Sequence, residues 1–519
     1  MNRIFIFIRT VFSHPFGVAF LVFLLSFAFF WILAPFGSFS DPDSFYHIAI
    51  TRNLASLGIP DTFPSLLYTH LAGAFTDHHF LYHILLWPFI FLFGDFEGAR
   101  LSAIFFAALF PAFFYLFLRF FNVRYPLIWT LFLFLMPAFV FRIHLVKAVG
   151  LSILFLLIFC YLLIRDKKWA LFFLSFLYVW LYGGFLIMPA VWFLYWVSRM
   201  IYKIIQEPGS FRERAAHLVS DKKNWMDSSV LGSGILIFLG MSLGLVINPF
   251  FPDNLYFYWI QTVEIALFNY SEAIGVGAEW YPYTFSTLFN GNIFYFFLLF
   301  VFVPLLAMGI KKMSKESLFF FLVSALFFIL TLKSRRYIEY AVPFGVLFGA
   351  FVFRDWNFTW NDVRRAINKK IVLYILCFSI LWALYQFLFL KDAVGGFRWD
   401  RYSHASLWIS ENIPKGSLVF NSDWDDFPIL YYRGKDFYYM TGLDPTFMYR
   451  YSSEKYEVWR KISSGEQTSD ISRDIVGKLG SHTVFVDRTD QKLLDENLAK
   501  DPRAKVGYQD SEASIYILE

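Results

Sequence analysis

Charge and cysteine are both scarce in this chain of 519 residues. Only 16% of the residues are charged, whereas 58% are hydrophobic and the mean hydropathy is +0.52. Soluble globular proteins carry about 25% charged residues, so the composition excludes a soluble protein and predicts a polytopic membrane protein. The two cysteines, Cys160 and Cys377, both fall inside apolar runs. They exclude a disulfide framework and a cysteine zinc site.

Several other features are missing from the sequence. Basic residues form no stripe and the formal net charge is only +5, so we expect no nucleic-acid partner. No small-residue cleavage site follows the first apolar run, which we interpret as a retained first span and not as a signal peptide. The chain has no internal repeat, and its apolar spans are nearly free of charge. Both absences count against a transporter.

The apolar runs set the expected topology. A helix needs roughly 20 apolar residues to cross the hydrocarbon core of a bilayer. By that rule we predict about eleven crossings, and we expect the shorter run Phe80–Phe93 to lie along the membrane interface instead. The predicted crossings are 16–35, 101–118, 126–141, 148–164, 169–182, 185–200, 230–249, 292–310, 317–332, 338–353 and 371–390.

Loop charge orients these spans. With the N-terminus in the cytoplasm, the loops on that side carry Lys and Arg clusters such as those within 165–168 and 311–315. This is the positive-inside pattern, and it would fail in every later loop if Phe80–Phe93 crossed. Crossings 169–182 and 185–200 are the weakest, because the glycine pair between them leaves a single hairpin open as an alternative.

The composition changes near residue 392. Charged residues become frequent, and short β-like runs at 417–420, 483–486 and 513–518 alternate with helix-like runs. We interpret residues 1–391 as a transmembrane domain and residues 392–519 as a soluble α/β domain of ordinary size. An odd number of crossings places this C-terminal domain outside the cell (inner) membrane.

Two outer loops break the positive-inside rule. Arg142 and Lys147 follow the third span, and Arg335 and Arg336 lie between the ninth and tenth spans. Arginine and lysine side chains bind phosphate oxygens, arginine in a bidentate manner. The pattern therefore predicts a site for a lipid phosphate at the outer face. For Lys147 the alternative, a side chain that only reaches for the headgroups, is equally open.

Acidic side chains are expected at the same face. The first outer loop contains Asp41, Asp43, Asp77 and His78, and the long loop before the eighth span contributes Glu279. Oxygen ligands from separate loops can hold Mg²⁺ or Mn²⁺, which would neutralise a departing phosphate. Asp41, next to a proline, is more readily explained as a turn residue, and His78 as the start of an interfacial helix.

Four segments resemble the catalytic subunit of oligosaccharyltransferases and the wider GT-C superfamily of polyprenyl-donor glycosyltransferases. They are Asp41–Tyr46, Gly275–Pro282, Arg336–Pro343 and Asp423–Tyr432. The third is the most specific, because it is similar to the family pattern Arg-aromatic-x-x-Tyr-Ala-Val-Pro. The resemblance implies a GT-C membrane fold and an inverting transfer of a sugar from a polyprenyl phosphate or diphosphate to an acceptor at the outer face.

The resemblance also implies roles for single residues. Asp43 is the implied catalytic carboxylate, and Glu279 is implied to assist it and to share the metal ion and the acceptor. The residues implied to bind the donor phosphate are Arg336, Arg335, Arg142 and Lys147. Those implied to bind the acceptor, a protein or a glycan, are Trp424 and Asp425.

One part of the family pattern is missing here. The family has a second acidic pair after an arginine, but Arg142 is followed by Ile143–Gly150, which contains no acid. A divalent cation would then need substitute ligands, or Lys147 would neutralise the phosphate in its place. The expected metal ligands are Asp43, Glu279, Asp77 and His78.

The acceptor of the enzyme and two alternatives to an enzyme stay open. The degenerate fourth segment does not support reading of a glycosylation sequon, so protein and glycan acceptors are both possible. A transporter of lipid-linked sugars is one alternative to the enzyme. A non-catalytic subunit of a glycan-assembly complex is another, and it would not need Asp43.

Overall fold

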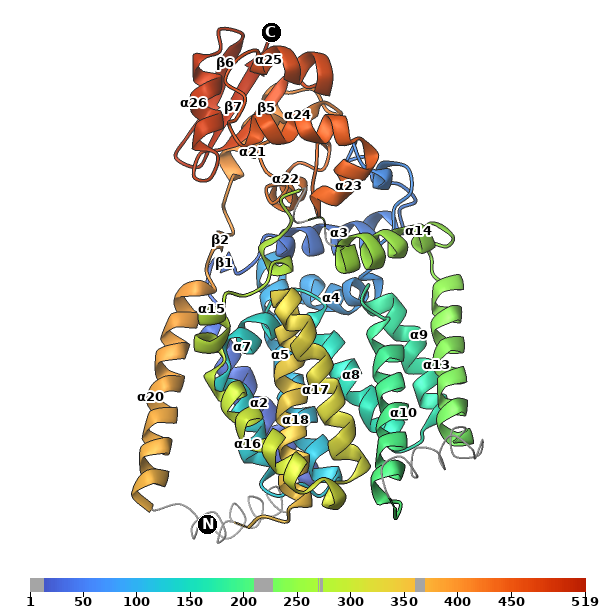
Figure 1. Cartoon of the computed structure of the whole chain (residues 1–519). Helices are drawn as coiled ribbons and strands as arrows, with labels where there is room; N and C mark the ends of the chain where they lie inside the picture. Colours follow the sequence, from blue (N-terminus) through green and yellow to red (C-terminus); the bar gives the residue numbers. More distant parts are fainter. Residues whose placement is uncertain (1–13, 210–226, 269, 271–273, 360–368) are drawn as a thin grey trace. The chain divides into compact units, whose positions relative to one another are not determined.

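The computed structural model describes residues 14–209, 227–268, 270, 274–359 and 369–519 (Figure 1). The chain divides into two compact units. The helical unit comprises Met1–Pro35, Leu101–Val246 and Glu279–Val394, and the mixed unit comprises Phe36–Arg100, Ile247–Ala278 and Gly395–Glu519. Both units therefore draw on stretches that lie far apart in the sequence.

The helical unit contains the long apolar helices. Six helices of the described residues are long and apolar enough to cross a membrane, or eight if each of two bent pairs forms one span. The total of eleven crossings stays a prediction. The helices are α2 (Pro15–Leu33), α5 (Asp95–Phe120), α6 (Pro126–Phe132), α7 (Pro137–Ile143), α8 (Val149–Ile164), α9 (Lys168–Leu181), α10 (Ile187–Gln206), α13 (Ser228–Val246), α15 (Phe285–Gly291), α16 (Ile293–Met308), α17 (Lys315–Lys333), α18 (Ile338–Asp355) and α20 (Lys369–Ala393).

Two of the predicted crossings contain sharp bends. The expected span 126–141 is split into α6, with a short 3₁₀ turn, and α7, which are bent by 88°. The break falls at Met136, whose backbone leaves the helical region (φ −118°, ψ 89°) because a proline follows it. The expected span 292–310 begins inside a second bend, of 84°, between α15 and α16.

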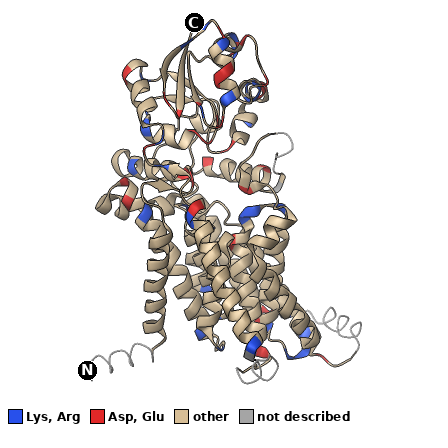
Figure 2. Cartoon of the chain, turned by 90° about the vertical axis from the view of Figure 1, so that its left-hand side faces the viewer, with Lys and Arg blue, Asp and Glu red and all other residues tan. Residues whose placement is uncertain are grey.

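Charged side chains gather at the helix ends. Figure 2 shows long helices that are almost free of Lys, Arg, Asp and Glu along their middle.

The predicted pair 169–182 and 185–200 forms two separate helices. Helix α9 ends at Leu181 and α10 begins at Ile187. Helix α9 packs mainly on α13, whereas α10 packs mainly on α17.

The mixed unit is built around a five-stranded sheet. Its order is β4-β3-β5-β7-β6, with β3 parallel to β4 and β5 and with β7 antiparallel to β5 and β6. Three of these strands correspond to the β-like runs expected from the sequence. The strands are β3 (Leu418–Asn421), β4 (Tyr438–Tyr439), β5 (Thr483–Asp487), β6 (Ala504–Gln509) and β7 (Ala513–Leu518).

Helices α21 and α26 pack on this sheet, and the mixed unit also contains helices of the first outer loop. Helix α4 has the bounds predicted from the sequence, Phe80–Phe93, and is shorter than a full span. The other helices are α3 (Asp43–Leu57), α14 (Asp253–Trp259), α21 (Ser403–Asn412), α22 (Phe427–Arg433), α23 (Pro445–Tyr451), α24 (Ser453–Ser463), α25 (Ile471–Asp474) and α26 (Lys492–Lys500).

The first outer loop folds together with the C-terminal segment. Its short strand β1 (Ser38–Phe39) pairs with β2 (Phe397–Arg398), and Leu66 forms a bridge with Tyr439. Helix α3 packs on α22, and the Asn53 amide donates to the Tyr431 hydroxyl at 2.9 Å. The boundary predicted at 391/392 lies near the junction of Val394 and Gly395. A division of function at that point stays a prediction.

Close helix contact in the helical unit depends on two glycines. A Cβ atom on Gly244 would lie 2.8 Å from the carbonyl oxygen of Phe176, and one on Gly240 would overlap the carbonyl oxygen of Phe172. These carbonyls belong to α9, so α13 approaches its backbone directly, as small residues allow in membrane helix pairs.

We expect Gly240→Leu to force α9 and α13 apart and to lower the stability of the chain by about 1–3 kcal/mol. Thermal unfolding of the purified chain in detergent measures the loss. The control is Gly291→Ala, because nothing lies within 4 Å of a Cβ atom at that position. Equal melting temperatures for the two variants would contradict the prediction.

Candidate functional site

Four charged side chains form an ion-pair cluster in the helical unit: Arg142, Glu279, Arg336 and Glu339. Arg142, at the end of α7, donates from Nε to Glu339 Oε2 at 2.7 Å and from Nη1 to Glu279 Oε2 at 2.5 Å. Arg336 Nη1 lies 3.6 Å from Glu279 Oε1. Two of the cationic segments predicted to bind a phosphate are therefore brought together.

Burial makes the balance of these charges important. Glu339 is fully buried in the first turn of α18, and Arg142 is 8% exposed. A buried charge is tolerated only when a partner and hydrogen bonds replace its water. Two guanidinium groups face two carboxylates here, so the cluster is neutral as a whole.

Arg336 has partners besides carboxylates. Its guanidinium lies over the ring of Trp280, 4.3 Å from the centroid, and its Nη2 donates to the Tyr182 hydroxyl at 3.1 Å. Its distance to Glu279 is longer than that of Arg142. Arg336 is thus oriented by aromatic side chains and is less tightly bound to the carboxylate.

The loop that carries Glu279 is fastened to the turn that carries the arginines. Ser334 Oγ donates to the carbonyl of Glu279 at 2.8 Å, and the Arg335 N–H donates to the carbonyl of Tyr281 at 3.1 Å. The Arg335 side chain donates from Nε to the carbonyl of Pro282 at 3.2 Å. Arg335 therefore contacts the loop backbone, whereas Arg336 contacts the Glu279 carboxylate.

The surrounding cations keep Glu279 ionised. Burial by itself would raise the pKa of Glu279, but Arg142, Arg336 and Lys147 outweigh it and hold the pKa well below its ordinary value. Lys147 thus acts on the same carboxylate as the two arginines. A group predicted to bind phosphate and a group predicted to hold a metal are neighbours in one cluster.

A second set of charged groups, the acidic cluster, lies in the mixed unit: Asp41, Asp43, Asp423 and Asp425. Asp41 Oδ1 accepts the Asp43 N–H at 2.9 Å, which is the turn geometry expected for Asp41. Asp43 begins α3. Burial and the charges of Asp423, Asp43 and Asp41 raise the pKa of Asp425 to about 8. The predicted catalytic carboxylate Asp43 and the predicted acceptor carboxylate Asp425 are therefore near enough for their charges to interact.

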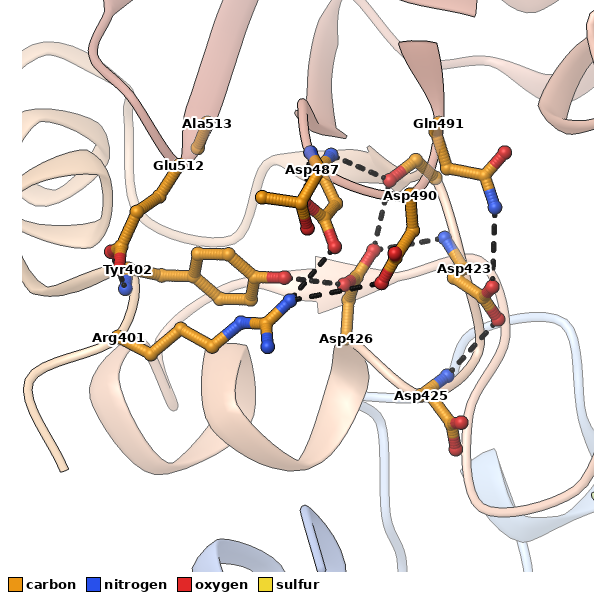
Figure 3. A network of polar contacts seen from close by, with 12 residues as sticks. Arg401, Tyr402, Asp423, Asp425, Asp426, Asp487, Asp490, Gln491, Glu512 and Ala513 are labelled. Atoms are coloured by element: carbon orange, nitrogen blue, oxygen red, sulfur yellow. Dashed lines mark hydrogen bonds and ion pairs between the residues drawn. The ribbon is translucent and has the colours of Figure 1, made fainter. Parts of the chain in front are cut away.

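Asp423 and Asp425 of the acidic cluster belong to a larger polar network (Figure 3). Asp426, at the start of α22, accepts from the Tyr402 hydroxyl at 3.0 Å, from Ser422 Oγ at 2.9 Å and from the Asp423 N–H at 2.9 Å. Asp423 in turn accepts from the Gln491 amide at 3.2 Å. The loop that carries Trp424 and Asp425 is thus fixed on both sides.

A histidine chain was not anticipated from the sequence. Asp77 Oδ2 accepts from His83 Nδ1 at 2.6 Å, and His83 Nε2 is hydrogen-bonded to His47 Nδ1 at 2.8 Å. All three residues are buried. His47 lies one helical turn after Asp43, so the two side chains share a face of α3.

The predicted metal ligands do not form a metal site within either unit. Among the described residues, no group of three or more His, Cys, Asp or Glu side chains is arranged to hold a metal ion. Both oxygens of Asp77 already accept hydrogen bonds, from the His79 N–H and from His83. The His78 ring stacks on Phe257, and Glu279 pairs with arginines. These donor sets do not fit a divalent cation, and metal binding stays a prediction.

Solved structures match this fold, whereas no protein-family model matches the chain and no curated protein matches it in sequence. One similar structure is the archaeal oligosaccharyltransferase AglB from Archaeoglobus fulgidus, solved in complex with an inhibitory peptide and a dolichol-phosphate. The match covers 96% of this chain and 74% of the AglB chain, with a TM-score of 0.62 and 12% identity. ArnT from Cupriavidus metallidurans, bound to undecaprenyl phosphate, covers 96% and 98%, with a TM-score of 0.57 and 12% identity.

A third similar structure is the arabinofuranosyltransferase AftD from Mycobacteria, which covers 96% of this chain and 40% of its own, with a TM-score of 0.55 and 10% identity. All three are GT-C proteins. This chain has the GT-C fold. It is a multi-pass membrane protein with a C-terminal domain that contains strands, so these two predictions are confirmed.

Sequence reasoning missed some of the residues that organise the two clusters. Glu339 could be recognised in the sequence as a carboxylate at the start of a span, where a charge is costly and usually has a function. Its partner Arg142 could not be recognised, because it lies 197 positions away. His83 and Tyr182 lie in apolar runs that show no such signal.

We expect Arg142→Ala to destabilise the helical unit by about 3–5 kcal/mol, because it leaves the buried Glu339 without a partner. The double variant Arg142→Ala/Glu339→Gln should recover part of this loss, since the uncompensated charge is then removed. Thermal unfolding in detergent measures both. A double variant no more stable than the single one would show that charge balance is not the cause.

The stability of the mixed unit should depend on pH through Asp426. Burial, followed by the charges of Asp423 and Asp487, raises the pKa of Asp426 from 3.8 to about 8. The folded state therefore holds a proton that the unfolded state has lost, and stability should fall as the pH rises from about 4 to about 8, by up to ~1.4 kcal/mol per pH unit for one proton.

Asp426→Asn should flatten this dependence, because asparagine does not titrate. Thermal unfolding is monitored by proteolysis of the C-terminal segment and is repeated across this pH range. The change in stability per pH unit is the slope to compare. Asp400→Asn is the matched control at an exposed carboxylate. A slope that is the same for Asp426→Asn and the unchanged chain would contradict the prediction.

Proposed function

We propose that this protein is an integral-membrane glycosyltransferase. It transfers a sugar or oligosaccharide from a polyprenyl phosphate or diphosphate to a protein or glycan acceptor at the outer face of the membrane. The observation that carries the proposal is the ion-pair cluster, because the buried Arg142 and the half-buried Arg336, from separate segments, meet there in a GT-C fold. Similar structures of that fold were solved with dolichol-phosphate and with undecaprenyl phosphate.

The donor phosphate is assigned to Arg336. Its guanidinium is held by Trp280 and Tyr182, and its ion pair with Glu279 is long at 3.6 Å. A phosphate, with more charge than a carboxylate, can take the place of Glu279 at this guanidinium. Arg142 keeps Glu279 in position during the exchange, and Lys147, Arg335 and Arg142 add positive charge around the leaving phosphate.

The acceptor is assigned to the acidic cluster. The acceptor nucleophile attacks the anomeric carbon, the bond from that carbon to the phosphate oxygen breaks, and the nucleophile's proton passes to Asp43. The configuration at the anomeric carbon is inverted. Asp425, with a pKa of about 8, can exchange a proton near neutral pH. This suits a group that orients the acceptor nucleophile and passes a proton to or from the general base Asp43. Trp424 lines the acceptor side.

The proposed topology follows from loop charge. The N-terminus lies in the cytoplasm, the chain crosses the cell (inner) membrane about eleven times, and the C-terminal segment lies outside. Both clusters are then assigned to the outer face.

Transfer of a radiolabelled sugar from a polyprenyl-linked donor tests the proposal. Asp43→Asn removes the base and should lower transfer by about 10²–10⁴-fold, and Arg336→Gln should lower it at least as much by leaving the phosphate charge unbalanced. Asp253→Asn and Arg473→Gln are matched controls that lie outside both clusters.

Two outcomes would contradict the enzyme assignment. Full transfer by both Asp43→Asn and Arg336→Gln would contradict the roles assigned to these residues, and absence of transfer by the unchanged purified chain would favour a non-catalytic subunit. Movement of labelled donor across vesicles without release of free lipid phosphate would favour a transporter.

A further inference from the structure

The helical unit has a second cationic region at the end opposite to the ion-pair cluster. Helix α18 begins next to Glu339, and its last turn carries Arg354, which donates to the carbonyl of Phe121 at 3.4 Å. The helix has 18 residues and is therefore about 27 Å long. Residues near Phe121 are thus separated from the proposed donor site by nearly the thickness of a hydrocarbon core.

A pocket of about 600 Å³ opens at this end. It lies between the first turn of α2, the last turns of α5 and the start of α6. Its polar lining includes Arg119, Arg124 and Asn122, and its apolar lining includes Val18, Leu127 and Ile128. No carboxylate belongs to the described residues that line it. The pocket is therefore basic on one side and apolar on the other.

The backbone that carries the two arginines is fixed. Helix α5 ends in a capped turn, in which the Asn122 N–H donates to the carbonyl of Arg119 at 3.1 Å and the Val123 N–H donates to that of Leu118 at 3.0 Å. Asn122 adopts φ 55°, the left-handed conformation that this cap requires. The two arginines thus stand at a set spacing before any ligand arrives.

Arg124 is also anchored from a neighbouring segment. Its Nη1 donates to the carbonyls of Asn357 and Phe358 at 2.8 and 3.1 Å. A guanidinium has five N–H donors, and these two bonds use only one of its nitrogens. Arg119, on the last turn of α5, is exposed.

We propose that this pocket binds the headgroup of an anionic phospholipid. Arg119 and Arg124 hold the phosphate, and Val18, Leu127 and Ile128 contact the first carbons of the acyl chains. The apolar wall favours a lipid over a free phosphate, because it continues into side chains that face outward: Leu127 is 44% exposed and Ile128 is 51% exposed. Basic pockets between helices recognise anionic lipids in this way. The proposal does not depend on the proposed enzyme activity.

Lipid retention by the full chain tests the site. The chain is purified in a neutral detergent, mixed with phosphatidylglycerol or with phosphatidylcholine of the same acyl chains, and examined by native mass spectrometry. We expect phosphatidylglycerol to be retained in preference to phosphatidylcholine. Arg119→Ala should weaken retention of phosphatidylglycerol about fivefold, since each basic residue near the surface contributes about that factor.

Matched variants separate the pocket from general surface charge. Lys311→Ala removes one positive charge at the same end of the unit but outside the pocket, and it should leave retention unchanged. Arg119→Lys keeps the charge and should retain most of the binding. Arg119→Gln replaces Arg119→Ala if the alanine variant differs from the unchanged protein in its size-exclusion elution or its melting temperature.

Three results would overturn the proposal. One is equal retention of the two lipids, which would mean that the arginines only orient the chain in the membrane. Another is a loss in Lys311→Ala as large as in Arg119→Ala. The third is displacement of phosphatidylglycerol by millimolar glycerol phosphate, which would identify a site for a free phosphate and not for a lipid.

Discussion

The helical unit depends on a neutral cluster of four buried or half-buried charges at the start of α18. Arg142 reaches Glu339 across 197 positions and Glu279 across 137 positions of the chain. Three segments that share no sequence continuity therefore meet through one guanidinium. Because each charge loses water on burial, the arrangement is favourable only when all members are present. Hydrogen bonds from Ser334 and Arg335 to backbone carbonyls also hold the loop 279–282 on the turn before α18.

In the proposed function a carboxylate and a phosphate alternate at one arginine, and the contacts of this cluster give a physical account of that exchange. Arg142 holds Glu279 closely, whereas Arg336 holds it at longer range and takes much of its orientation from aromatic rings. Arrival of an anion at Arg336 then costs the cluster one weak contact and not its whole network. The fold itself does not decide this chemistry, because GT-C neighbours at 10–12% identity share architecture and not side chains.

Much of the secondary structure could be predicted, because the signals are local. The apolar run Phe80–Phe93 marks the bounds of α4, and the β-like runs mark three strands of the sheet. The bends were missed because a count of apolar residues takes no account of backbone conformation. Met136 leaves the helical region because a proline follows it. The pairing of Arg142 with Glu339 and the docking of the first outer loop on the C-terminal segment could not be predicted. Both depend on contacts between distant residues, which leave no periodic pattern in a single sequence.

The union of the first outer loop with the C-terminal segment sets an order for biogenesis. Strand β1 and helix α3 emerge early from the ribosome, but their partners β2 and α22 are made more than 350 residues later. At ordinary rates of synthesis this delay is on the order of tens of seconds. During that interval the surface of α3 that later packs on α22 stays uncovered.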